Sequence, residues 1–153
     1  MKPEEAVKVI SFMIDNDYKP VIIWGADKEQ IRGVVDRVID NTKISYFGFD
    51  ASKLMDDNMA EQVVEALNSV ENARWLVHID DITNGTHIAR SRAYKMLCNG
   101  RIEDIFENTV LKNDHIVIGG IINNNENVNN RNNLMDRTAY RKLTHIVLDE
   151  ASI

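Results

Sequence analysis

Two acidic residues at the end of a short apolar stretch, Asp80 and Asp81, are the side chains of this sequence best placed to do chemistry. A carboxylate in such a position can hold Mg²⁺, and a neighbouring carboxylate can act as a base. A second apolar stretch, residues 20–24, is followed by a sharp turn at Gly25 and then by Ala26, Asp27 and Lys28, where an amphipathic helix begins. A glycine turn between a buried strand and a helix is where many α/β domains bind phosphate, because the helix N-terminus carries free backbone N–H groups.

The elements that must position these residues alternate along the chain. Short apolar runs rich in β-branched residues predict strands at 20–24, 44–49, 74–79, 115–122 and 145–148. Apolar residues at helical spacing predict helices from Pro3, over about 28–40, from 56–57, after Thr86 and over 135–143. The weaker pattern of residues 101–112 favours a small hairpin, and residues 123–133, with eight asparagines, are typical of a surface loop. The alternation predicts an α/β domain with a mostly parallel sheet and helices on both faces.

The carboxyl ends of the predicted strands bring the candidate residues together. Ligands of parallel α/β sheets bind at these ends. Gly25, the Asp80-Asp81 pair and Asn123 each follow a predicted strand. Three stretches that are far apart in the sequence are therefore expected to converge on one edge of the sheet.

Composition favours a single cytoplasmic domain. The chain has 153 residues, 44% of them hydrophobic, and a formal net charge of −6, which suits one substantial core and argues against general nucleic-acid binding. Its single cysteine, Cys98, excludes an intrachain disulfide and fits a reducing compartment. The first residues lack a signal-peptide pattern, and no apolar run approaches the roughly 18 residues that span a membrane.

The order of these features resembles the ATPase core of the AAA+ family, particularly its MoxR-like branch, over about residues 3–150. Five segments carry the resemblance: the Walker A strand and turn (20–26), Walker B (75–82), the helix and hairpin that follow it (93–102), the sensor-1 strand (115–123) and the arginine-finger segment (134–148). The resemblance implies a three-layer αβα domain of P-loop NTPase type, with a five-stranded, mostly parallel sheet of order 5-1-4-3-2. Because so few residues follow this core, we expect residues 1–153 to form a single AAA+-like domain without the helical lid of the family.

The residues that bind phosphate and magnesium in the Walker A loop of the family are absent from this sequence. The family loop needs glycines so that backbone N–H groups can turn around the phosphates, a lysine for the β/γ oxygens, and Ser or Thr for magnesium. Counting from Gly25, the later glycines fall on Lys28 and Gln30, the lysine falls on Ile31, and the Ser/Thr falls on Arg32. Ile31 belongs to the apolar face of its helix and is expected to be buried. The turn from Gly25 to Lys28 would then be a remnant of a nucleotide-binding loop, in which Lys28 either offers charge or is simply solvated.

The Walker B acids leave two interpretations open. By resemblance, Asp80 would bind magnesium and Asp81 would replace the glutamate that activates water, with a side chain one methylene shorter. Because a shift near 1 Å can lower a rate by about 100-fold, hydrolysis would be impaired. In the second interpretation, the two acids cap the next turn together with Thr83 and Asn84.

The last two family positions are also open to a structural interpretation. By resemblance, the sensor-1 position falls on Asn123, Asn124 or Asn125; in the alternative interpretation, these residues belong to a hydrophilic loop. Arg137, Arg141 and Lys142 would lie near the arginine-finger position, which acts on the ATP of a neighbouring subunit. Their structural interpretation is a basic, solvated face of a short helix.

These observations favour a catalytically silent AAA+-like domain, a pseudo-ATPase, that needs no cofactor and acts by binding a protein, either an AAA+ ATPase or another copy of itself. It would serve as a regulatory or assembly subunit, and the asparagine-rich loop and short length suggest a phage or mobile-element origin. The enzymatic alternative is a divergent ATPase that uses ATP and magnesium through Asp80 and Asp81. The sequence is also compatible with a replication subunit similar to a clamp loader or helicase loader, and with a Rossmann-like binding module of different strand order. Direct nucleic-acid binding is not expected.

Overall fold

The computed structural model describes residues 1–16, 21–55, 57–70, 74–84, 86–99, 114–122 and 141–149. In chain order these residues form α1 (Pro3–Asp15), β1 (Val21–Gly25), α2 (Lys28–Thr42), β2 (Ser45–Phe49), the 3₁₀ helix η1 (Ala51–Met55), α3 (Asp57–Asn68), β3 (Trp75–Ile79), α4 (His87–Asn99), β4 (His115–Ile122) and β5 (Thr144–Val147). Each predicted strand is present, and η1 is an element that the sequence pattern did not predict. The hairpin and the asparagine-rich loop predicted for residues 101–112 and 123–133 lie outside the described residues, as does most of the helix predicted for 135–143.

The five strands form one parallel sheet in the order β2-β3-β4-β1-β5. This is the predicted order 5-1-4-3-2 seen from the opposite edge, so the predicted architecture is confirmed. The different strand order expected for a Rossmann-like module is not observed. Phe49 of β2 pairs with Ile79 of β3, and Gly25 of β1 pairs with Ile122 of β4. The carboxyl ends of these strands therefore lie along one edge of the sheet.

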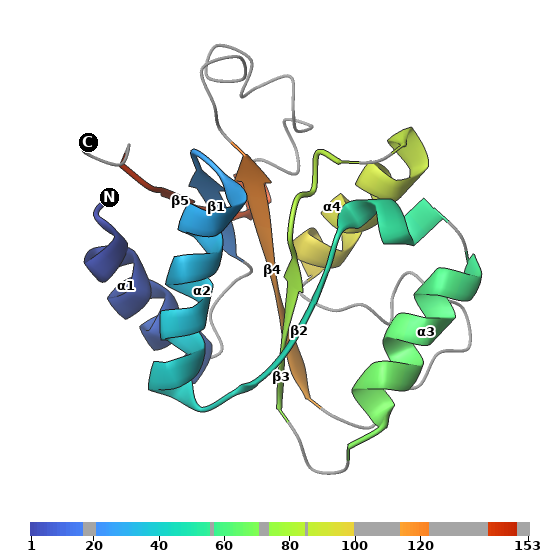
Figure 1. Cartoon of the computed structure of the whole chain (residues 1–153), viewed down its shortest axis with the longest axis horizontal. Helices are drawn as coiled ribbons and strands as arrows, with labels where there is room; N and C mark the ends of the chain where they lie inside the picture. The colour runs from blue at the N-terminus through green and yellow to red at the C-terminus, as the bar shows by residue number, and fades with distance from the viewer. Residues whose placement is uncertain are drawn as a thin grey trace.

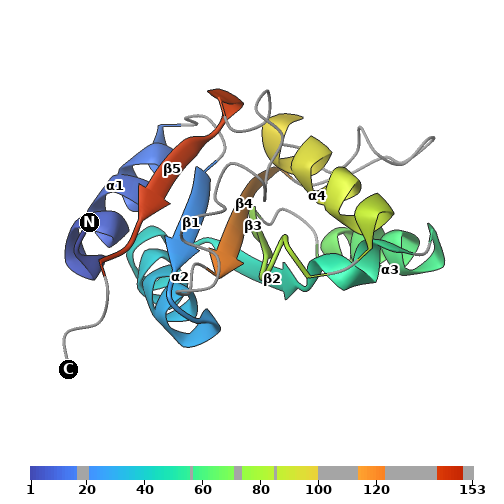
Figure 2. The same ribbon diagram turned by 90° about the horizontal axis from the view of Figure 1, so that it is seen from above.

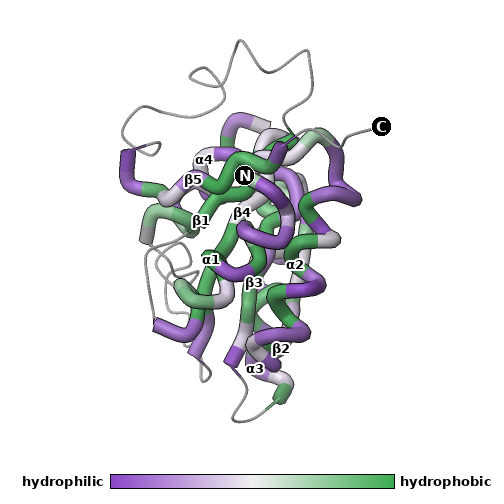
Figure 3. The backbone as a smooth tube through the Cα atoms, turned by 90° about the vertical axis from the view of Figure 1, so that its left-hand side faces the viewer, coloured by the Kyte–Doolittle hydropathy of each residue, from purple (hydrophilic) through white to green (hydrophobic). Residues whose placement is uncertain are grey.

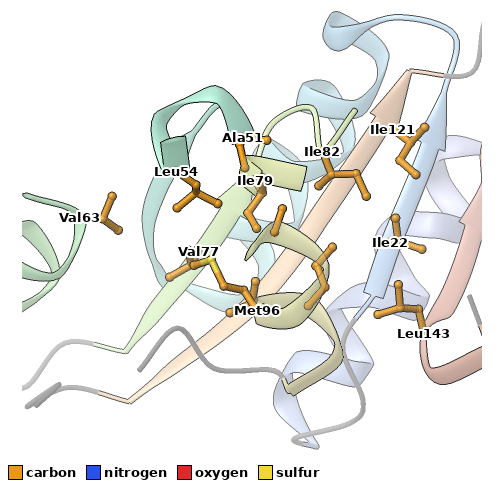
Figure 4. Packing of buried hydrophobic residues seen from close by; sticks show 14 of the residues in the cluster. Ile22, Ala51, Leu54, Val63, Val77, Ile79, Ile82, Met96, Ile121 and Leu143 are labelled. Atoms are coloured by element: carbon orange, nitrogen blue, oxygen red, sulfur yellow. The ribbon is translucent and has the colours of Figure 1, made fainter. Parts of the chain in front are cut away.

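Helices cover both faces of the sheet, as Figures 1 and 2 show: α1 and α2 lie on one face, and α3 and α4 lie on the other. Side chains of alternate strand residues point to opposite faces. In β1, Ile22 and Trp24 belong to the cluster on the α3/α4 face, whereas Val21 and Ile23 belong to the cluster on the α1/α2 face. Figure 4 shows part of the first cluster, in which Val77 of β3 lies beside Met96 of α4 and Ile22 of β1 lies near Leu143.

Helix α2 illustrates how the sequence pattern produces this packing. Figure 3 shows hydrophobic and hydrophilic segments alternating along its turns, while β1 is hydrophobic over most of its length. Its buried residues recur at helical spacing: Ile31, Val34, Val35 and Val38. The helix ends at Lys43, whose backbone is left-handed with φ 58° and whose N–H donates to the carbonyl of Ile39. None of the helices formed by the described residues has the length and apolar character needed to cross a membrane.

Candidate functional site

The connection between β1 and α2 is only two residues long. The strand ends at Gly25 and the helix begins at Lys28, so that Ala26 and Asp27 alone join them. The side chain of Ile31 lies directly against the strand end, because a Cβ atom added to Gly25 would sit 2.6 Å from Ile31 Cγ1. Ile31 is fully buried, and the position where the resemblance places a lysine therefore belongs to the core.

Polar groups of this turn are already hydrogen-bonded to other groups of the protein. Asp27 is the N-cap of α2, and its carboxylate accepts a hydrogen bond from the Gln30 N–H at 2.8 Å. Gln30 in turn accepts from the Ala26 N–H at 2.8 Å, and its Nε2 donates to the carbonyl of Asp149 at 2.7 Å. The Asp27 contact and the Asp-x-x-Gln spacing resemble a capping box, in which a polar N-cap residue is followed three residues later by Glu or Gln, but Gln30 accepts from the residue that precedes the N-cap. That spacing, Asp-x-x-Gln, is a sequence signal for Gln30 that reasoning from the phosphate-loop motif missed.

Replacing Gln30 with alanine is expected to lower the free energy of unfolding by about 1–2 kcal/mol, because two hydrogen bonds to the backbone are lost. Urea denaturation followed by circular dichroism measures this difference. Glu29→Ala, which changes an exposed neighbour in the same helical turn, is the matched control and should change stability by less than about 0.5 kcal/mol. Equal stability of the two variants would contradict a structural role for Gln30.

Asp80 lies at the carboxyl end of β3 and faces two basic residues of α2. His78 and Asp80 alternate with Val77 and Ile79 along the chain, which places their side chains on the α1/α2 face. The Arg32 Nη2 atom lies 3.6 Å from Asp80 Oδ2, and the Lys28 Nζ atom lies 3.9 Å from the same oxygen. The second carboxylate oxygen of Asp80, Oδ1, is buried and has no hydrogen-bond partner among the described residues. Lys28 and Arg32 are four residues apart and thus share one side of the helix.

Asp50, which follows β2, extends this charged cluster. Its Oδ2 atom lies 3.5 Å from Lys28 Nζ, and its carboxylate accepts hydrogen bonds from the Ser52 N–H at 2.9 Å and from Asn84 Nδ2 at 3.0 Å. Burial alone would raise the pKa of Asp50, but these hydrogen bonds and the charge of Lys28 outweigh it and lower the pKa below its ordinary value. The sequence reasoning did not single out Asp50 or Arg32, because their roles depend on neighbours from other elements.

Asp81 points into the turn that follows β3. Its Oδ1 atom accepts hydrogen bonds from the Thr83 hydroxyl at 2.7 Å and from the Thr83 N–H at 3.1 Å, and its carbonyl accepts from the Asn84 N–H at 3.2 Å. These are the contacts of an Asx-type turn. The carboxylate that would activate a water molecule is thus already hydrogen-bonded within the chain.

A buried histidine lies beside the charged cluster. The Nδ1 atom of His78 is 3.1 Å from the hydroxyl of Tyr46, while its Nε2 atom is buried without a hydrogen-bond partner in the described part of the chain. Burial lowers the pKa of His78 to about 4; Asp80 opposes this shift and Arg32 adds to it. His78 is therefore neutral at physiological pH.

The remaining predicted site residues do not join this cluster within the described ranges. Arg141 and Lys142 are exposed and precede β5. Asn123 and Arg137 lie outside the described residues. Among the residues that the structure describes, no group of three His, Cys, Asp or Glu side chains is arranged to hold a metal ion.

Similar proteins were found among solved structures only. No family model and no curated protein matches the sequence. The fold is similar to the RuvB Holliday junction branch migration motor of Thermotoga maritima, with a TM-score of 0.55 and 13% identity over 98% of this chain. A point mutant of the same protein gives a TM-score of 0.58 with 13% identity over 95% of this chain, and Drosophila ORC bound to DNA gives 0.53 with 9% identity over 97%.

RuvB and ORC are AAA+ P-loop ATPases, and they share the parallel sheet with flanking helices described above. The fold of this chain is therefore similar to the fold of AAA+ ATPase cores. The chain spans 43% of the RuvB chains and 29% of the ORC chain, so the similarity concerns one part of those proteins. With identities of this size, the AAA+ likeness applies to the fold and its topology.

Proposed function

We propose that this chain is a non-catalytic AAA+-like domain, a pseudo-ATPase, that acts by binding other proteins as a regulatory or assembly subunit. The observation that carries the proposal is the two-residue connection between β1 and α2, in which Ile31 packs against Gly25. A working phosphate loop needs several inward-facing N–H groups and a lysine at this point. Here the chain enters the helix at once, and the Ala26 N–H is already bonded to Gln30.

The residues present do not fit a nucleotide with magnesium. A magnesium ion at Asp80 would have to displace Arg32 and Lys28, whose cationic groups lie 3.6 and 3.9 Å from its Oδ2 atom. Two protein cations already balance the charges of Asp50 and Asp80, which supports a structural role for these acids. We therefore propose no cofactor, and we propose that the partner is a protein, either an AAA+ ATPase or a second copy of this chain.

Isothermal titration of the chain with ATP and magnesium tests the proposal. The expected result is no binding tighter than about 1 mM, and a P-loop ATPase titrated under the same conditions verifies the sensitivity. Binding in the micromolar range that disappears in Asp80→Ala, with the variant still folded by circular dichroism, would instead support the divergent ATPase.

A further inference from the structure

The outer edge of β2 combines an unpaired strand with an apolar hollow. Within the described residues, β2 pairs with β3 on one side only. The Ser45 N–H donates to Arg74 and the Phe49 carbonyl accepts from Asp80, so these residues direct their backbone groups towards β3. Because this direction alternates along a strand, the N–H and C=O groups of Tyr46 and Gly48 point outward, away from the sheet.

This edge lacks the features that usually protect an exposed strand. Edge strands are commonly blunted by charged residues, proline or bulges, because their free backbone groups can pair with another chain. The strand from Ser45 to Phe49 carries no charge and no proline. The opposite edge differs: Met1 bonds along the end of β5, with its amino group on the Val147 carbonyl at 2.8 Å and its carbonyl on the Asp149 N–H at 2.8 Å.

A hollow of about 260 Å³ lies beside this edge on the α3 face of the sheet, lined by Phe47, Phe49, Lys53, Gln62 and Val63. It is smaller than the pockets of about 300–1,000 Å³ that hold drug-sized ligands, and it suits one large apolar side chain. Phe47 and Phe49 are only partly buried against the core. Lys53 lies at the rim, and its side chain is exposed.

From these features we infer that β2 receives an extended segment of a partner protein as a sixth strand, with a large apolar side chain in the hollow and an acidic side chain beside Lys53. In such strand addition, main-chain hydrogen bonds supply affinity and pockets for alternate side chains supply specificity. Tyr46 and Gly48 provide the main-chain groups, and the hollow provides the pocket. This inference rests on the proposed function, which states that the chain binds a protein, and it adds the chemistry of the segment that is bound.

Charge favours a different protein over a second copy of this chain as the occupant. The β2 strand of a second copy contains no acidic residue to pair with Lys53. The net charge of −6 also opposes the approach of two identical copies. An alternating segment with a large apolar residue and an Asp or Glu on the same face satisfies both the hollow and the lysine.

Panning a phage-displayed library of short random peptides against the folded chain tests this inference. We expect enriched peptides with that alternating pattern, which bind as synthetic peptides with Kd in the micromolar range. In NMR spectra they should shift the amide signals of Tyr46 and Gly48 and slow their hydrogen exchange. Failure to enrich such peptides, or shifts that map away from residues 45–49, would overturn the inference.

Backbone methylation of the synthetic peptide separates strand addition from binding in the hollow alone. Methylating the peptide amides that face β2 should weaken binding by about fivefold for each hydrogen bond lost. Methylating the alternate amides, which face away, should leave Kd unchanged. Equal effects of the two methylation patterns would contradict strand addition.

Two surface variants test the hollow without removing core atoms. Gln62→Trp fills the hollow and should weaken peptide binding by about tenfold or more, whereas Glu61→Trp, which lies further around the same helix from Val63, is the matched control. Lys53→Glu should weaken the binding of acidic peptides, with Lys8→Glu on α1 as its control.

The oligomeric state of the free chain tests the choice of occupant. If the free chain is a dimer by light scattering and its Tyr46 and Gly48 amides are already protected, the edge is a self-association site and the inference is wrong. Neither outcome affects the ATP titration, so the two proposals fail separately.

Discussion

A lysine in place of Ile31 is expected to lower the free energy of unfolding by about 3–5 kcal/mol, although lysine is the residue that a phosphate loop would carry there. Ile31 is fully buried and belongs to the core cluster between α2 and the sheet. Its side chain also lies close to Gly25 and Gly120 at the ends of β1 and β4. The substitution removes apolar packing and places an ammonium group within an apolar cluster.

Chemical denaturation in urea measures this effect, and two controls define its cause. Ile31→Val keeps the site apolar and should cost about 1 kcal/mol. Arg32→Lys changes the exposed neighbour, keeps its positive charge beside Asp80, and should cost less than about 1 kcal/mol. If Ile31→Lys is as stable as Ile31→Val and gains ATP binding, the turn opens into a phosphate loop and the proposed function is wrong.

Acidification from pH 7.5 to pH 5 is expected to lower the free energy of unfolding by about 2 kcal/mol through His78 alone. Burial keeps the pKa of His78 at about 4 in the folded chain, whereas an unfolded histidine titrates near 6.5. The unfolded state therefore binds more protons in this window, and stability rises with pH. The contribution is complete above about pH 6.5 and is lost as the pH falls through the folded value.

Urea denaturation at about pH 7.5, 6 and 5 measures this dependence. His78→Gln should flatten it, because the substituted residue does not titrate, while His87→Gln at the exposed start of α4 should leave it unchanged. The lowered pKa of Asp50 moves the contribution of that carboxylate to more acidic pH, below this window. A pH dependence that persists in His78→Gln would show that other groups cause it.

The two predictions concern the same face of the sheet. Ile31 is buried against Gly25 at the end of β1, and His78 of β3 lies two residues before Asp80. Between them, Arg32 and Lys28 bring positive charge to Asp80 and Asp50. Under the proposed function, this apolar side chain and these ion pairs take the place of a nucleotide at the edge, and surfaces such as β2 carry the binding.

Local patterns in the sequence were sufficient for the elements of the fold. Strand and helix periodicities depend on residues within a few positions of one another, so the alternation of elements and the burial of Ile31 could be predicted directly. The strand order came from the resemblance to the AAA+ core, and the observed sheet confirms it. The short helix η1 escaped prediction because its five residues are too few to show a period.

The contacts of the candidate site were decided by tertiary structure. Tyr46 and His78 are 32 residues apart in the chain, and Gln30 reaches a carbonyl 119 residues away. Such pairs depend on which strands are neighbours and on which face each side chain points to, and no local period encodes either. The sequence by itself determined an AAA+-like sheet with an altered phosphate turn. Only the packed structure decided that basic residues of α2 pair with the acids, and that, among the described residues, β2 is an edge strand beside a hollow.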